Sequence, residues 1–147
     1  MRALVQRVNT ASVSVDDKLI SKIDNGLLVL LGIRSDDTQK DRDYVLKKIL
    51  NLRIFPDEKN KMNKSVVDVS GEILLVSQFT LYGDCSKGNR PSFVQAMSPE
   101  LAEPFYKNFA STLKQSYHKV KEGVFAAYMH VALVNDGPVT IFIDSKK

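Results

Sequence analysis

The chain has 147 residues, 44% of them hydrophobic and 26% charged, which predicts one folded domain over residues 1–147 and excludes a disordered chain. Its longest apolar run, Leu27–Leu31, is far shorter than the ~20 residues that cross a bilayer, so we expect no contact with a membrane. The single cysteine, Cys85, excludes an internal disulfide framework. No signal-peptide pattern follows Met1, and we therefore expect a cytoplasmic protein.

The formal net charge of +4 admits two interpretations. A moderate excess of Lys and Arg fits contact with a polyanion through a few phosphates. It also fits a solvated lysine surface, and the charge alone favours this second interpretation.

The first part of the chain predicts strands joined by turns. Apolar and polar residues alternate over residues 11–15, as in a strand with one wet face, and Leu19–Ile23 can pair back on it across a turn at residues 16–18. Asn25-Gly26 marks a second turn. Leu27–Ile33 is apolar on both faces, which predicts a central strand.

A helix is predicted from Thr38 to about Arg53. Thr38 with Asp41 resembles a capping box, and Val45 lies on the apolar stripe. The helix cannot continue through Pro56.

A second helix is predicted to begin after Ser98, with Pro99 in its first position. Pro104 predicts an irregular first turn, or a restart of the helix at that residue. Apolar residues at steps of four predict the buried face of this helix: Leu101, Phe105, Phe109 and Leu113.

Polar residues at Asp57–Lys64 predict a mobile surface loop, and short apolar runs predict strands at Val66–Val69, Ile73–Val76, Val124–Val134 and Val139–Ile143. The total is about seven strands and two helices. Because two helices cannot cover both faces of such a sheet, we expect an α/β fold in which the helices lie on one side of a mostly antiparallel sheet folded on itself.

The segment Ser77–Asp84 (SQFTLYGD) follows a fully apolar strand, at the kind of strand-to-loop transition where functional residues gather. Ser77 or Thr80 is a candidate nucleophile, but a hydroxyl needs an adjacent base. The alternative role is electrostatic: the backbone amides of Phe79 and Thr80 can point at a developing oxyanion. A third interpretation is a plain strand end in which Thr80 is a packing residue.

The candidate bases are few. His118 is predicted to lie on the surface, and a structural role is favoured for His130 in its strand. A triad of Ser77 or Thr80 with His130 and either Asp84 or Asp136 stays open, because triad members need not be close in sequence.

The segment Asn135–Thr140 (NDGPVT) predicts a stiff turn between two strands, at Gly137-Pro138. A reactive thiol at Cys85 is not favoured, because no Cys–His pattern is present. One cysteine and two scattered histidines offer no metal-ligand spacing, and no phosphate-binding glycine loop is present. We therefore expect no metal and no cofactor.

Taken together, SQFTLYGD and GPVT, in this order and after the opening MRALVQRV, resemble the D-aminoacyl-tRNA deacylases, also called D-tyrosyl-tRNA deacylases. The resemblance spans essentially the whole chain. It implies a three-layer α/β/β fold, a homodimer, and hydrolysis of the ester that joins a D-amino acid, or glycine, to the terminal adenosine of tRNA.

The resemblance also implies roles for individual residues. Ser77, Gln78, Phe79 and Thr80 form the side of the site that binds the adenosine and the ester, and Thr80 has also been considered as a nucleophile. Gly137 and Pro138 of the partner subunit, joined by a cis peptide bond, form a gate that senses the chirality of the substrate. Arg7 braces this gate.

Two other functions stay open at this point. One is a non-catalytic tRNA-binding module, supported by the basic charge and by the absence of an ordinary catalytic group. The other is a Ser/Thr hydrolase of small esters that uses His130. Whether Lys87 and Arg90 contact the acceptor stem of tRNA is also left open.

Overall fold

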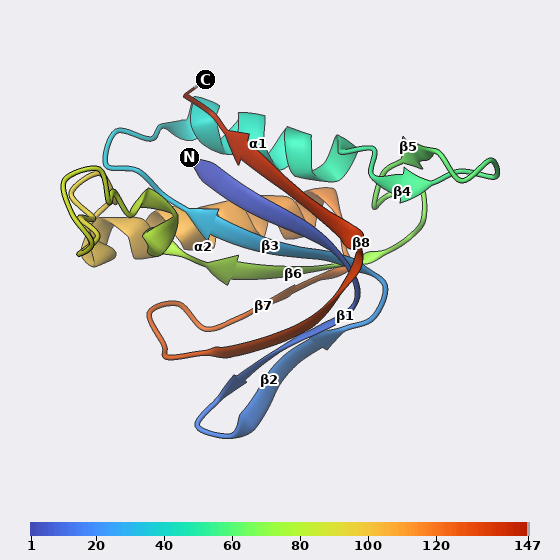
Figure 1. Ribbon diagram of the computed structural model, residues 1–147, viewed down its shortest axis with the longest axis horizontal. Helices are drawn as coiled ribbons and strands as arrows, with labels where there is room; N and C mark the ends of the chain where they lie inside the picture. Colours follow the sequence, from blue (N-terminus) through green and yellow to red (C-terminus); the bar gives the residue numbers. More distant parts are fainter. Residues whose placement is uncertain (147) are drawn as a thin grey trace.

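The computed structural model describes residues 1–146, and its sheet is organised around the long strand β1 (Arg2–Val15). One edge of β1 pairs antiparallel with β3 (Gly26–Gly32) near its start and with β2 (Lys18–Ile23) near its end. Strand β8 (His130–Asp144) pairs antiparallel with β1 along almost its whole length. Strands β1 and β8 bend together, which carries β2 away from the rest of the sheet (Figure 1).

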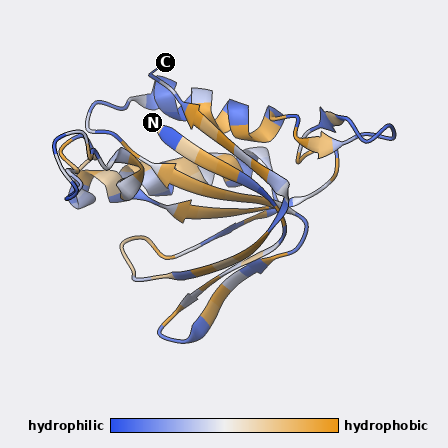
Figure 2. Ribbon diagram, viewed as in Figure 1, coloured by the Kyte–Doolittle hydropathy of each residue, from blue (hydrophilic) through white to orange (hydrophobic). Residues whose placement is uncertain are grey.

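The sheet continues from β3 in parallel to β6 (Glu72–Ser77) and from β6 in parallel to β7 (Val120–Glu122). Its order is β2-β1-β3-β6-β7, with β8 beside β1. The antiparallel pairing predicted for the sheet therefore holds around β1. The central strands are mostly apolar along their length, as expected for strands covered on both faces (Figure 2).

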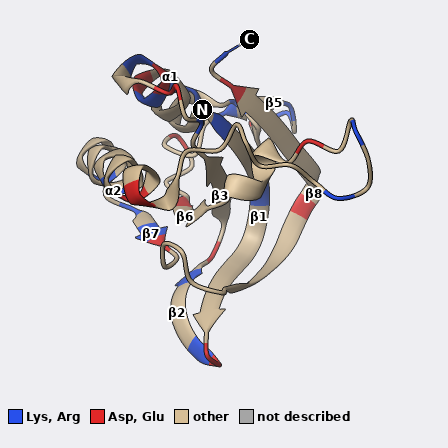
Figure 3. Cartoon of the chain, turned by 90° about the vertical axis from the view of Figure 1, so that its left-hand side faces the viewer, with Lys and Arg blue, Asp and Glu red and all other residues tan. Residues whose placement is uncertain are grey.

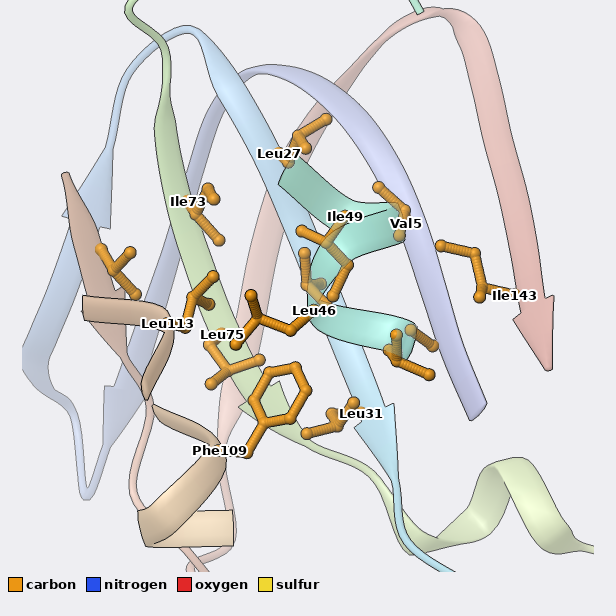
Figure 4. Close-up of a cluster of buried hydrophobic side chains, with 14 of the residues drawn as sticks. Val5, Leu27, Leu31, Leu46, Ile49, Ile73, Leu75, Phe109, Leu113 and Ile143 are labelled. Atoms are coloured by element: carbon orange, nitrogen blue, oxygen red, sulfur yellow. The ribbon is translucent and has the colours of Figure 1, made fainter. Parts of the chain in front are cut away.

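Helices α1 (Gln39–Asn51) and α2 (Pro99–Ser116) lie on the same side of the strands (Figure 3). The predicted capping box of α1 is present, since Asp41 accepts a hydrogen bond from the Thr38 N–H at 2.8 Å. Between helices and sheet lies the larger core, in which Ile49, Phe109 and Leu113 lie over strand residues such as Leu75 (Figure 4).

A second, smaller core lies on the opposite face of the sheet. Val13 of β1 and Ile23 of β2 are fully buried against Leu28 of β3 and Leu74 of β6. The sheet is thus folded on itself, and the layers are helices, central strands and the bent ends of β1, β2 and β8. This arrangement confirms the predicted α/β fold with three α/β/β layers.

Two of the predicted segments between the helices are wrong. Val66–Val69 is not a strand but a series of turns, because Asp68 accepts a hydrogen bond from the Ser65 N–H at 2.8 Å and closes the segment on itself. The predicted loop Asp57–Lys64 contributes β5 (Met62–Lys64), which pairs with β4 (Phe55–Pro56).

The last predicted strands also need correction. Residues 124–129 of the predicted strand Val124–Val134 are irregular, and Ala126 there has a positive φ of 59°. A short strand, β7, lies ahead of them and was not predicted. The two predicted strands at the C-terminal end are parts of one strand, β8, which continues through Gly137-Pro138.

Helix α2 begins at Pro99 as predicted and runs unbroken through Pro104. Leu101, predicted to be buried, is 65% exposed. The buried face is rotated because its residues lie at steps of four and three rather than four alone: Ala102, Tyr106, Phe109, Ala110 and Leu113. No helix among the described residues is long and apolar enough to cross a membrane.

Both ends of the described chain meet at the start of α1. The α-amino group of Met1 donates hydrogen bonds to Asp37 Oδ1 at 2.5 Å and to Ser145 Oγ at 2.6 Å. Ser145 Oγ in turn donates to Asp41 Oδ1 at 2.7 Å, and Lys146 Nζ lies 3.1 Å from Asp41 Oδ2. This network fixes the ends of β1 and β8 to the helix layer.

Asp41 links Ser145 and Lys146 to the start of α1 in this network. Burial alone would raise the pKa of Asp41, but hydrogen bonds from Ser145 and Thr38, together with the Lys146 ammonium, outweigh it and hold that pKa well below its ordinary value. Because the pKa is lower in the folded than in the unfolded state, the resulting stabilisation is complete above about pH 4 and declines as the pH falls further.

We therefore expect Asp41→Asn to lower the free energy of unfolding at pH 7 by about 1–2 kcal/mol, measured by urea denaturation. The difference from the wild type should shrink below about pH 4. Asp43→Asn is the matched control, since Asp43 is 61% exposed and pairs with its neighbour Arg42. Equal stability of the two variants at pH 7 would contradict the role given to Asp41.

Candidate active site

The segment singled out in the sequence begins where β6 ends. After Ser77, the Gln78 N–H donates a hydrogen bond to the Leu31 carbonyl at 2.7 Å, which keeps the chain against β3 beyond the last residue of the strand. The Gln78 side-chain amide donates to Thr80 Oγ1. The 3₁₀ helix η1 (Phe79–Tyr82) follows at once.

Two amides at the start of η1 have no partner within the helix. At the two ends of η1, the Leu81 N–H donates to the Gln78 carbonyl at 3.3 Å, and the Gly83 N–H donates to the Thr80 carbonyl at 2.9 Å. The N–H groups of Phe79 and Thr80 precede these bonds, as the leading amides of any helix do. Both residues are exposed; Phe79 lines the cavity described next, whereas Thr80 is not among its lining residues.

A cavity of about 560 Å³ lies beside η1, a volume typical of sites for small organic groups. Phe79 is 56% exposed at this cavity, and its ring packs edge-on against Phe93 with the ring centroids 5.0 Å apart. The other lining residues come from the ends of β3 and β6, from residues 96–102 and from residues 125–131. Tyr128 is the one residue with an ionisable side chain among the described residues that line it.

The second segment, at Asn135–Thr140, leaves the β-ladder. Gln6 lies opposite Thr140 and Val8 lies opposite Asn135, so Arg7 alone on β1 faces the four residues 136–139 of β8. The extra residues must bulge out of the sheet. The Gly137-Pro138 peptide bond in this bulge is cis, and Gly137 has a φ of +140°.

Two side chains hold the bulge in place. Arg7 Nε donates to the Asp136 carbonyl at 3.1 Å and lies 2.9 Å from Asp136 Oδ2, while its Nη1 donates to the Ile54 carbonyl at 2.5 Å. Asn135 Oδ1 accepts a hydrogen bond from the Val139 N–H at 2.8 Å. The structure thus brings Arg7 and the turn together, as the sequence analysis expected.

The two segments lie far apart within one protomer. Ser77 pairs with Leu31 at the end of β3, whereas Arg7 and the bulge lie at Leu27, near its start. Of the described residues that line the cavity beside η1, none belongs to 135–140. The two segments therefore do not form one site within the described protomer.

The alternative triad is not assembled. His130 is exposed on β8. Its ring packs edge-on against the Tyr128 ring, with the ring centroids 5.6 Å apart. Asp84 accepts a hydrogen bond from the Ser86 N–H, and Asp136 pairs with Arg7. His118 is also exposed, as predicted. No cluster of metal-ligating side chains occurs within residues 1–146.

Arg2 contacts η1 in a way that no motif of the sequence indicates. Its Nη1 donates to the Leu81 carbonyl at 2.9 Å, and its guanidinium lies 4.5 Å from the centroid of the Tyr82 ring. Its Nε also pairs with Asp144 Oδ2 at 3.0 Å. Arg2 therefore holds the C-terminal end of η1 against the ends of β1 and β8. These contacts join residues about 80 and 140 positions apart, which no local pattern reveals.

Comparisons with known proteins agree with this geometry. The family model described as D-Tyr-tRNA(Tyr) deacylase matches residues 4–144. The D-aminoacyl-tRNA deacylase of Thermosipho melanesiensis is 57% identical over 148 residues, covering 100% of this chain and 99% of that protein.

Two solved structures share the fold. The c-Myc DNA Unwinding Element Binding Protein superposes with a TM-score of 0.94 at 51% identity, covering 98% of each chain. A probable eukaryotic D-amino acid tRNA deacylase superposes with a TM-score of 0.86, covering 97% of each chain; at 17% identity it supports the fold alone.

The relatives that match over the whole chain make it a hydrolase. The chain belongs to the D-aminoacyl-tRNA deacylase family, which confirms the resemblance seen in the sequence.

Proposed function

We propose that the enzyme hydrolyses the ester that joins a D-amino acid to the 3′-terminal adenosine of tRNA, releasing the free amino acid and the tRNA. This reaction removes D-amino acids before they enter translation, in the cytoplasm. Glycyl-tRNA, whose amino acid has no side chain to exclude, is a substrate of the same site. Support comes from the family membership and from the cavity beside η1.

One observation carries the mechanism: the 3₁₀ helix η1 begins at Phe79, a residue that lines a cavity whose described lining holds no His, Lys, Asp or Glu. We assign the Phe79 and Thr80 amides to hold the ester carbonyl oxygen as water attacks and negative charge develops on it. The ribose hydroxyl next to the ester activates the water. The terminal adenosine binds along Ser77, Gln78 and Phe79.

The chirality of the substrate is sensed by Gly137 and Pro138 of the partner subunit in a homodimer. A hydrophobic pocket separates mirror-image amino acids by only ~1–3 kcal/mol, whereas a steric clash discriminates far more steeply. The bulge at residues 136–139 is exposed at Gly137 and Pro138 and held by Arg7, so it presents a fixed backbone to a ligand. An L side chain would have to occupy the space of this backbone.

Support for a dimer comes from β8. Among the described strands it pairs with β1 alone, so its outer edge leaves N–H and C=O groups free to pair. Val134 of this strand is 52% exposed, and Leu133 is 37% exposed. Pairing of two copies near this edge would cover both side chains.

The direct test is to incubate the protein with D- and L-aminoacyl-tRNA carrying the same amino acid and to measure the amino acid released. We expect release from the D form to exceed release from the L form by more than the ~200-fold that a pocket alone provides. Tight binding without release would instead identify a non-catalytic tRNA-binding module. His130→Ala should leave the activity unchanged; its loss would support the small-ester hydrolase.

The role of the amides is tested at Phe79, the first residue of η1, where proline fits the helix but has no N–H. We expect Phe79→Pro to lower kcat by about 10²–10³-fold relative to Phe79→Leu, which also loses the aromatic ring but keeps the amide. Thr80→Ala should keep most of the activity. A Thr80→Ala variant without activity would show that the hydroxyl is the nucleophile.

The shared gate is tested by mixing two inactive variants. A Cβ at position 137 would lie 2.7 Å from Val139 Cγ2 on a backbone with positive φ, so Gly137→Ala should displace the gate and lose activity. After random reassociation with Phe79→Pro subunits, one of the two sites in each mixed dimer has both parts intact. We therefore expect recovery of roughly a quarter of wild-type activity. No recovery would mean that the gate and η1 act within one subunit.

A further inference from the structure

The loop between η1 and Phe93 carries two cations without an acidic partner. Lys87 and Arg90 form no ion pair with any described residue, whereas Arg2, Arg7 and Arg34 are each paired with an aspartate. All residues from 83 to 92 are exposed. The loop projects from the body of the molecule, and its basic segments lie on the projecting part (Figure 3).

The base of this loop is fixed. Asp84 and Ser92 exchange two backbone hydrogen bonds, from the Asp84 N–H at 2.8 Å and from the Ser92 N–H at 2.9 Å. The Asp84 carboxylate, the one acid in the loop, accepts a hydrogen bond from the Ser86 N–H at 2.9 Å. Asp84 thus lies at the base, and Lys87 and Arg90 are the charges toward the tip.

The loop is also continuous with the candidate site. Gly83 ends η1, and a Cβ at Gly83 would lie 3.1 Å from the Phe93 ring. Phe93, the first residue after the loop, lines the cavity and packs on Phe79. Both ends of the loop therefore adjoin residues of the cavity, Phe79 through η1 and Phe93 directly.

We propose that Lys87 and Arg90 bind phosphates of the single-stranded 3′ end of tRNA, in the nucleotides that precede the terminal adenosine. This inference rests on the proposed function, which places that adenosine in the cavity. An unpaired guanidinium and an unpaired ammonium suit phosphate oxygens, and a flexible single strand can follow the surface of the loop. The two residues contribute to binding of the RNA and not to the chemistry at the ester.

The experiment compares two substrates, D-aminoacyl-tRNA and D-aminoacyl-adenosine, which carries the same ester and no phosphate. We expect the double variant Lys87→Ala with Arg90→Ala to lower kcat/KM for the tRNA substrate about tenfold through KM, with kcat unchanged. The plot of log(kcat/KM) against log[salt] should become shallower by about 1.4, or about 0.7 for each lost contact. Hydrolysis of D-aminoacyl-adenosine should not change.

The matched control is Lys40→Ala with Lys47→Ala, which removes the same charge from exposed positions at the start and on the outer face of α1. It should leave the salt dependence at the wild-type value. The assignment would be overturned if the double variant lost kcat/KM equally on both substrates. It would also be overturned if the control changed the salt dependence as much as the double variant does. A double variant with wild-type kinetics on tRNA would overturn it as well. Wild-type protein inactive on both substrates would instead overturn the proposed function, and this inference with it.

Discussion

The antiparallel pairing of β1 with β8 positions every part of the candidate site. It extends from Arg2 opposite Asp144 to Ser14 opposite His130, and both strands bend together along it. At one end, Arg2 pairs with Asp144 and reaches η1 through the Leu81 carbonyl. In the middle, residues 136–139 of β8 bulge out of the ladder opposite Arg7 of β1. One pair of strands therefore fixes both the amides of η1 and the backbone of the bulge, although these lie at different ends of β3.

The chemistry of the site follows from what its lining can supply. The described lining of the cavity holds no His, Lys, Asp or Glu, and we therefore assign the stabilisation of the developing negative charge to backbone dipoles. Such dipoles need a rigid frame, because an amide displaced by about 1 Å loses much of its effect. The hydrogen bond from the Gln78 N–H to Leu31 and the contact of Arg2 with Leu81 provide that frame. The same reasoning applies to the bulge, where Arg7 and Asn135 fix a backbone that has no side chain at Gly137.

The predictions from sequence succeeded where a local pattern was complete. The alternation at residues 11–15, the apolar strand from Leu27 and the capping box at Thr38 each correspond to an observed element. They failed where other hydrogen bonds or the packing of the helix overrode the apolar pattern. Val66–Val69 is apolar enough for a strand, but hydrogen bonds between Ser65 and Asp68 form turns there instead. The stripe of α2 was misplaced because Leu101 fits a step of four, while the helix presents Ala102 to the sheet.

The sequence by itself determined the family, the two helices and the residues of both site segments, because these depend on short motifs and on periodicity within one element. The tertiary structure alone decided that the two segments lie at different ends of β3 and that Arg7 and Arg2 hold them. It also decided that His130 packs against Tyr128, while Asp84 and Asp136 bond to other residues. The contacts of Arg2 with Leu81 and of Arg7 with Asp136 join residues 79 and 129 positions apart. Such pairing is set by the registers of β1 with β3 and β8, which no single stretch of sequence encodes.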